Sequence, residues 1–144
     1  MAIHLGIDPG KKGAIATFDT ETMRVNIVDM PTTTSELHDH LAGLPIIKGC
    51  ILEKLFAGPV MGRATIGTMF MNYGILKGAL MWCDIPFREE RPNVWKPALN
   101  LSKDKNASRE MAMQMFPDDA DLFKRVKDDG RAEAALLAWR SSRK

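Results

Sequence analysis

The chain's 144 residues are the length of one domain, and 45% hydrophobic and 26% charged residues exclude intrinsic disorder, so residues 1–144 are expected to form a single folded unit. The 20 basic and 18 acidic residues leave a formal charge of only +2, so any surface that binds a polyanion has to be local. No apolar run is long enough to cross a membrane and no secretory leader pattern is present, so we expect an intracellular, cytoplasmic protein without a membrane partner.

The first half of the chain alternates short apolar segments with turn residues. Four of these segments predict strands: 3–7, 14–18, 24–29 and 46–52. The first predicted strand ends at the turn-forming Asp8-Pro9-Gly10, and the fourth ends at Glu53. Between the third and fourth strands, Ser35-Glu36-Leu37 indicates the start of a short helix that ends before Gly43. The first three strands are therefore expected to form an antiparallel meander.

The second half of the chain is mainly helical. The spacing of its apolar residues predicts a strand over 85–89 and four helices: 64–83, 92–99, 104–116 and 129–143. Gly67, Gly74 and Gly78 interrupt the first helix, and because glycine weakens a helix, another backbone is expected to approach it closely. The methionines of this helix predict core packing, and its second apolar face predicts contact with a partner. The order of the elements predicts an α/β fold with a mixed sheet flanked by helices.

Acidic residues lie at the ends of the predicted elements. Asp8 and Glu53 directly follow apolar strands, and functional groups gather at the strand ends of α/β sheets. Asp129 and Glu133 lie about 40° apart around the last helix, whereas Asp128 lies about 140° from Glu133. If these acids meet, hard cations such as Mg²⁺ or Mn²⁺ would offset their repulsion, and two such ions catalyse displacement at phosphate. The structural alternative is a turn at Asp8 and helix caps at the two aspartates.

Several sequence blocks, taken in order, carry a resemblance. They are GIDPGKKGAIA, the strand ending in ILEK, the segment ending in NYGILKGALM, RPNVWKPALNLSKDKNASREMAMQMFP, and DDGRAEAALLA. In this order they resemble the RuvC-type Holliday junction resolvases, particularly those of bacteriophages, over nearly the whole chain. The resemblance implies an RNase H-like fold, with a five-stranded mixed sheet and helices on both sides. It also implies a homodimer that resolves four-way and other branched DNA junctions by two-metal phosphodiester hydrolysis during recombination and repair, in the host cytoplasm if the chain is phage-encoded.

The resemblance also implies a set of metal ligands. Asp8 matches the family's first-strand aspartate, Glu53 matches the glutamate that ends the fourth strand, and Asp129 and Glu133 match the carboxylates of the last helix. The cellular enzymes commonly have an acid or a histidine three residues before a final aspartate, whereas this chain has Gly130 there and Glu133 in place of the aspartate. This departure leaves open which of the two adjacent aspartates at the start of the helix is the ligand, and helical phase favours the second.

Basic residues in the matching blocks are candidates for DNA contact. Lys96, Lys103 and Lys105 fall where the family places lysines that approach DNA phosphate, and Lys105 is also expected to stabilise charge on the scissile phosphate. Arg109 lies one turn beyond Lys105 on the same predicted helix. Phe56 lies in the loop after the fourth strand, where an aromatic ring can wedge into a junction. The alternatives are a solvated charge run for the lysines and a core position for Phe56.

Two other functions are compatible with parts of the sequence. GIDPGKKG is also typical of the phosphate loop in the actin and hexokinase ATPase fold, but that fold needs two such domains. The non-enzymatic alternative is a junction-binding module that has lost cleavage, although an acidic cluster lowers the affinity of a surface for a polyanion.

Overall fold

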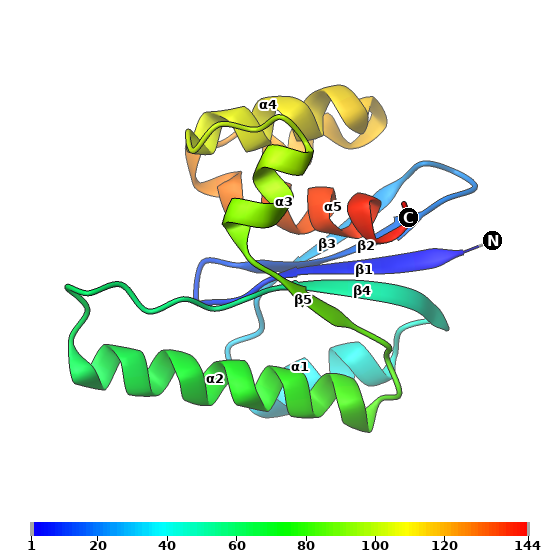
Figure 1. The fold of residues 1–144 in the computed structure, drawn as a ribbon. Coiled ribbons are helices and arrows are strands. Elements are labelled where there is room, and N and C mark those ends of the chain that lie inside the picture. The colour runs from blue at the N-terminus through cyan, green and yellow to red at the C-terminus, as the bar shows by residue number, and fades with distance from the viewer. Residues whose placement is uncertain (1, 144) are drawn as a thin grey trace.

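The computed structural model describes residues 2–143, apart from the side chain of Lys105. Its centre is a five-stranded sheet in the order β3-β2-β1-β4-β5 (Figure 1). The strands are β1 (Ile3–Asp8), β2 (Ala14–Asp19), β3 (Val25–Asp29), β4 (Ile47–Glu53) and β5 (Arg88–Glu90). The first three strands pair in antiparallel fashion, whereas β4 runs parallel to β1 and to β5, so the sheet is mixed.

Helices cover both faces of this sheet. They are α1 (Thr34–Ala42), α2 (Arg63–Trp82), α3 (Pro92–Ala98), α4 (Lys105–Met115) and α5 (Asp129–Ser141), with the 3₁₀ helices η1 (Pro117–Phe123) and η2 (Val126–Asp128) before α5. α1 and α2 lie on one face, and α3, α4 and α5 lie on the other (Figure 1). The predicted α/β class, with a five-stranded mixed sheet and helices on both sides, is confirmed. Within the described residues, no helix is both long and apolar enough to cross a membrane.

The two-residue period of the strands directs two acids to the same face of the sheet. Ile7 of β1 and Leu52 of β4 pack in the core under α1 and α2. The residues that follow them, Asp8 and Glu53, therefore face the other side, toward α5. Because the parallel register pairs Ile7 with Leu52, the two strands end side by side.

α5 lies directly against β1 because glycine leaves no side chain between them. A Cβ atom on Gly6 would lie 2.1 Å from the carbonyl oxygen of Ala134 and 2.2 Å from the nitrogen of Ala138. In the first turn of α5, a Cβ atom on Gly130 would lie 2.3 Å from the carbonyl oxygen of Lys12. A side chain at either position would push the backbones apart, so glycine sets the depth at which α5 reaches the strand ends.

The fifth strand is shorter than the sequence pattern predicts. It covers Arg88–Glu90 rather than 85–89. Pro86 has no N–H to donate to a sheet ladder, and Asp84 adopts a φ of 55°, which suits a turn. Pairing with β4 therefore begins only after the proline.

α2 differs most from expectation. Its inner face buries three side chains: Tyr73, Leu76 and Leu80. Met71 and Met81, however, are 68% and 63% exposed, so the prediction that these methionines pack in the core is wrong. A Cβ atom added to Gly67, Gly74 or Gly78 would meet no atom within 4 Å. The close backbone approach predicted for these glycines is therefore not made within residues 2–143.

Candidate functional site

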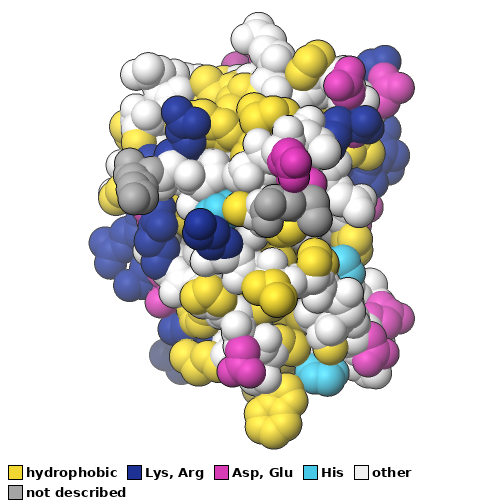
Figure 2. All heavy atoms as spheres, turned by 90° about the vertical axis from the view of Figure 1, so that its right-hand side faces the viewer, with side chains coloured by type: hydrophobic (Ala, Val, Ile, Leu, Met, Phe, Trp, Pro, Cys, Tyr) yellow, Lys and Arg dark blue, Asp and Glu magenta, His cyan; other side chains and the backbone are white. Residues whose placement is uncertain are grey.

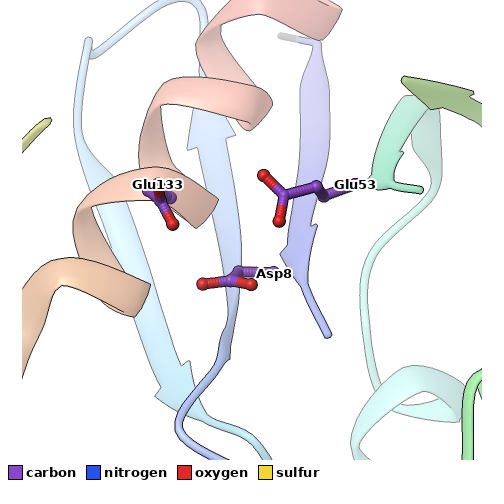
Figure 3. Close-up of side chains that lie close together, drawn as sticks. All are labelled: Asp8, Glu53 and Glu133. Carbon is purple, nitrogen blue, oxygen red and sulfur yellow. The ribbon is translucent and has the colours of Figure 1, made fainter. Parts of the chain in front are cut away.

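Three carboxylates converge at the edge where β1 and β4 end (Figure 3). Asp8 is the last residue of β1, Glu53 is the last residue of β4, and Glu133 lies in the second turn of α5. One oxygen atom from each carboxylate lies within 4.8 Å of the other two. The structure thus brings together three acids that lie far apart in the sequence and that the sequence pattern singles out.

Burial and mutual repulsion raise the pKa values in this cluster. The pKa of Asp8 lies well above its usual value, first because of burial and then because of the charges of Glu53, Glu133 and Asp129. Burial, followed by the charge of Glu133, raises the pKa of Glu53 to about 7. The cluster therefore holds its negative charge at a free-energy cost that a cation would reduce.

Helix α3 supplies partners to two of the three acids. The indole Nε1 of Trp95 donates a hydrogen bond of 2.9 Å to Oε2 of Glu53. The next residue, Lys96, places its Nζ 2.5 Å from Oε1 of Glu133 and 5.6 Å from the centre of the Trp95 ring. Lys96, predicted from the resemblance as a DNA contact, thus lies at the acid cluster. Sequence patterning does not single out Trp95, and its position beside Lys96 in a matching block is the only signal for it.

The two adjacent aspartates at the start of α5 have different surroundings. The carboxylate of Asp128 accepts a 2.9 Å hydrogen bond from the backbone N–H of Arg125 and another of 2.9 Å from its guanidinium, and Arg131 lies 3.8 Å away. Asp128 therefore caps the turn before α5, and among the described residues it is not part of the carboxylate cluster. The charge of Asp129, by contrast, helps to raise the pKa of Asp8. The ion pairs of Asp128 and the electrostatic effect of Asp129 on Asp8 together favour Asp129 over Asp128 as a further ligand candidate.

Steric crowding explains why the residue three positions before Glu133 is a glycine. A Cβ atom on Gly130 would lie 2.3 Å from the carbonyl oxygen of Lys12 and 3.2 Å from Oδ2 of Asp8. The acid or histidine that the cellular enzymes carry at the matching position would collide with the backbone between β1 and β2. Position 130 therefore cannot supply a carboxylate to the cluster without a shift of the backbone, whereas Asp129 directly precedes it.

Arg109, predicted as a DNA contact, makes structural contacts in the folded chain. Its guanidinium is largely buried and donates hydrogen bonds of 2.9 and 3.0 Å to the carbonyl oxygens of Arg125 and Lys124. These carbonyl groups lie in the turn that precedes η2. Arg109 therefore ties α4 to this turn through two of its three guanidinium nitrogens, and DNA contact by Arg109 stays a prediction.

The other predicted DNA contacts lie at the surface or beyond the described part of the chain. Phe56 is 72% exposed in the loop between β4 and α2, so the alternative of a core position is wrong. Lys103 is exposed just before α4. Lys105 is the first residue of α4, and its side chain lies outside what the structure describes. DNA contact by these residues stays a prediction.

The donor set fits a hard divalent cation. Asp8, Glu53 and Glu133 offer only carboxylate oxygens, which Mg²⁺ and Mn²⁺ prefer over nitrogen or sulfur. Among the described side chains, Lys96 forms an ion pair with one of the three acids, Glu133, so negative charge is left there for a cation to balance. Residues that could hold such a cation are therefore these three acids, with Asp129 nearby.

The metal-free protein is expected to lose stability as the pH rises. Glu53 has an ordinary pKa of 4.5 and a folded-state pKa of about 7, so the folded state binds more protons between these values and its stability falls through this window. The shift corresponds to roughly 3 kcal/mol. Melting temperatures in EDTA should therefore fall from pH 4.5 to 8 in the wild type and fall much less in Glu53→Gln.

The comparison with Glu53→Gln is needed because two histidines change the stability of the protein with pH in the direction opposite to Glu53. Burial lowers the pKa of His4 and of His40 from 6.5, so both add stability as the pH rises toward that value. The difference between the two proteins reports Glu53 together with its effect on Asp8, whose pKa the charge of Glu53 also raises. Equal pH dependence in wild type and Glu53→Gln would contradict the electrostatic picture of the cluster.

The fold of this chain recurs in solved structures of DNA junction resolvases. No protein-family model and no curated protein matches the sequence significantly. The structure of Thermus thermophilus RuvC in complex with a Holliday junction substrate matches with a TM-score of 0.69 and 14% identity, over 96% of this chain and 90% of that chain. Another T. thermophilus RuvC structure matches with a TM-score of 0.62 and 15% identity, over 97% and 95%. The fowlpox virus Holliday junction resolvase matches with a TM-score of 0.54 and 18% identity, over 96% and 95%. The chain therefore has the fold of the RuvC-type Holliday junction resolvases, as its sequence blocks predict.

Proposed function

We propose that this chain is a metal-dependent endonuclease that cuts four-way and other branched DNA junctions by hydrolysing phosphodiester bonds. The observation that carries the proposal is the convergence of Asp8, Glu53 and Glu133 at one sheet edge, in a chain with a resolvase fold. One of the similar structures contains a Holliday junction substrate, which makes the four-way junction the first substrate to test.

The proposed site holds Mg²⁺ or Mn²⁺, with two ions per site, between Asp8, Glu53, Glu133 and Asp129. When bound, such ions stabilise charge on the scissile phosphate and lower the pKa of the attacking water. The chain's own contribution is to fix its carboxylates on two strands and one helix, so that their positions do not depend on a mobile loop. Lys96 supports this arrangement because its ion pair with Glu133 reduces the repulsion within the cluster.

Exposed cations next to the cluster support the binding of a polyanion. Lys11 and Lys12 lie in the turn after β1, and Lys54 directly follows β4. Such charges attract the DNA backbone and offset its repulsion by the carboxylates. Phe56, two residues beyond Lys54, has its ring exposed on the same loop, where we propose that it stacks or wedges at the crossover of a junction.

The exposed face of α2 supports the homodimer that the resemblance implies. Gly67, Gly74 and Gly78 share this face with the exposed Met71 and Met81. Figure 2 views the end of the molecule opposite the carboxylates and shows hydrophobic side chains exposed in its lower part, where α1 and α2 lie. We propose that two copies pack through α2 in a two-fold contact, so that two sites can cut opposite strands of one junction.

A labelled four-way junction tests the proposed function directly. Paired nicks should form in Mg²⁺ and not in EDTA, and a linear duplex of the same sequence should stay intact. Junction binding without cleavage at any Mg²⁺ or Mn²⁺ concentration would instead support the non-cleaving binding module. ATP hydrolysis without junction binding would support the ATPase alternative.

Lys105→Ala is expected to slow cleavage by more than it weakens binding. If Lys105 neutralises one phosphate, its loss lowers the log–log salt slope of junction binding by about one unit. If it also stabilises charge on the scissile phosphate, the cutting rate at saturating enzyme falls on the order of a hundredfold, or about 2.7 kcal/mol. Fluorescence polarisation at several salt concentrations and single-turnover cleavage measure the two effects separately.

Lys103→Ala is the matched control, because Lys103 is exposed two residues before Lys105 and lies outside α4. Equal, small effects of both variants would mean that the lysines are a solvated charge run. A large rate loss for Lys103→Ala alone would mean that Lys103, and not Lys105, stabilises charge on the scissile phosphate.

A further inference from the structure

Trp95 is a core residue whose one polar atom reaches the acid cluster. Its side chain is completely buried in the core that also contains residues of α4 and α5. Its indole Nε1 nevertheless donates a 2.9 Å hydrogen bond to Oε2 of Glu53. The indole therefore connects the core of the protein to the carboxylate that ends β4.

The carboxylate of Glu53 needs a partner to fix its orientation. The torsion that rotates a glutamate carboxylate has a broad distribution, without sharply preferred states. A hydrogen bond to Oε2 fixes the plane of the group and so also sets the direction of Oε1. Because the indole N–H is a neutral donor, it orients the carboxylate without cancelling the charge that attracts a cation.

The indole is itself held in place by α3. Pro92 occupies the first turn of this helix, and the backbone N–H of Trp95 donates to the carbonyl oxygen of Arg91 over 3.1 Å. The Nζ of Lys96 lies 5.6 Å from the centre of the indole ring and contacts Glu133. Two consecutive residues of one helix thus contact two of the three acids, one from β4 and one from α5.

We propose that Trp95 is a positioning residue of this site, and that its N–H holds Glu53 in the orientation in which Asp8, Glu53 and Glu133 take up a divalent cation. Hydrogen-bond partners behind metal ligands typically contribute roughly 10- to 100-fold in metal affinity or activity. The consequence for cleavage rests on the proposed function, whereas the consequence for cation affinity does not.

Trp95→Phe tests this role because it keeps an aromatic ring and removes the N–H. Isothermal titration of the full chain with Mn²⁺ alone, without DNA, should show a dissociation constant roughly 10- to 100-fold higher than in the wild type. In junction cleavage, the Mg²⁺ concentration for half-maximal rate should rise in parallel, while the rate at saturating Mg²⁺ changes much less. An unchanged Mn²⁺ affinity would overturn the proposal.

Trp139→Phe is the matched control for loss of an indole. Trp139 packs against the same core from α5, and its ring contacts Arg143 rather than an acid of the cluster. We expect this variant to keep the wild-type Mn²⁺ affinity even where its metal-free melting temperature falls as far as that of Trp95→Phe. An equal loss of Mn²⁺ affinity in both variants would mean that core packing matters and the hydrogen bond does not.

A double-substitution cycle separates the hydrogen bond from any general effect on the site. In a Glu53→Ala background the indole has lost this acceptor, so Trp95→Phe should cause no further loss of Mn²⁺ affinity. A further loss in that background would overturn the proposal. If the wild type cuts no junction, the proposed function fails, and the Mn²⁺ titrations still decide the role of Trp95.

Discussion

Asp8→Asn and Glu53→Gln are each expected to abolish junction cleavage and to leave junction binding unchanged or tighter. Each substitution removes a carboxylate oxygen from the cluster and one negative charge from a surface that would face DNA. We expect the single-turnover rate to fall at least about a thousandfold, which corresponds to roughly 4 kcal/mol. The labelled junction in Mg²⁺ measures the rate, and a gel-shift experiment in EDTA measures binding.

The same two variants are expected to fold at least as stably as the wild type in EDTA. Burial and neighbouring charges raise the pKa of Asp8 and of Glu53, so the folded state without metal favours their neutral forms, and a neutral amide of the same shape relieves that repulsion. A loss of cleavage with a raised melting temperature at pH 8 therefore separates a role in chemistry from a role in folding. Near-normal cutting by either variant would show that the site lies elsewhere.

Asp128→Asn and Asp129→Asn form a matched pair of controls at the start of α5. Asp128 caps a turn through Arg125, so its substitution should lower the melting temperature and leave the cutting rate largely intact well below that temperature. Asp129→Asn should lower the cutting rate well below the temperature at which the variant unfolds. The reverse outcome would assign the ligand to Asp128.

The positions of the acids at the strand ends could be predicted because they follow from local rules. A strand alternates its side chains with a period of two, and parallel strands in register end at the same edge. Asp8 and Glu53 each follow an apolar segment, so their convergence needed only the pairing of β1 with β4. The prediction of Glu133 depended on a third element, the last helix, on which Glu133 lies four residues after Asp129.

Contacts between distant segments could not be predicted in the same way. Trp95 and Glu53 are 42 residues apart, and their hydrogen bond depends on how α3 packs against the sheet. Arg109 lies one helical turn after Lys105, which led to the prediction that both face DNA. That turn of α4 is covered by the segment before η2, whose carbonyl groups Arg109 binds. Helical spacing gives the angle between two residues around the helix axis, but it does not tell which side of the helix is buried.

Glycines illustrate the same limit. Gly6 and Gly130 are required because α5 approaches the backbone of β1 and of the turn after it. Gly67, Gly74 and Gly78 are surrounded by open space in the single chain. The sequence shows the same residue type at all five positions. Only the folded structure tells which glycines allow two backbones to pack closely and which glycines lie on an open surface.

Gly74→Glu is expected to convert a dimer into monomers. Gly74 lies in the middle of the exposed face of α2, where the single chain has room for a side chain, and its replacement improves helix propensity by roughly 0.5–1 kcal/mol. In a two-fold contact through this face, the new carboxylate would be buried beside its own copy, which costs several kcal/mol. Analytical ultracentrifugation should show a dissociation constant at least about a hundredfold higher than in the wild type.

Cleavage of a cruciform in a supercoiled plasmid shows the consequence of losing the dimer. Paired cuts within one binding event yield linear plasmid, whereas independent cuts yield nicked circles first. Gly74→Glu should therefore shift the product from linear to nicked plasmid.

Asn72→Glu is the matched control, because it adds the same charge to the same helix outside the proposed contact. Asn72 is exposed and lies about 160° around the helix from Gly74. We expect Asn72→Glu to remain dimeric and to cut in pairs. A wild-type protein that sediments as a monomer at micromolar concentration and still cuts in pairs would contradict the dimer, and a dimer that withstands Gly74→Glu would move the interface away from this face of α2.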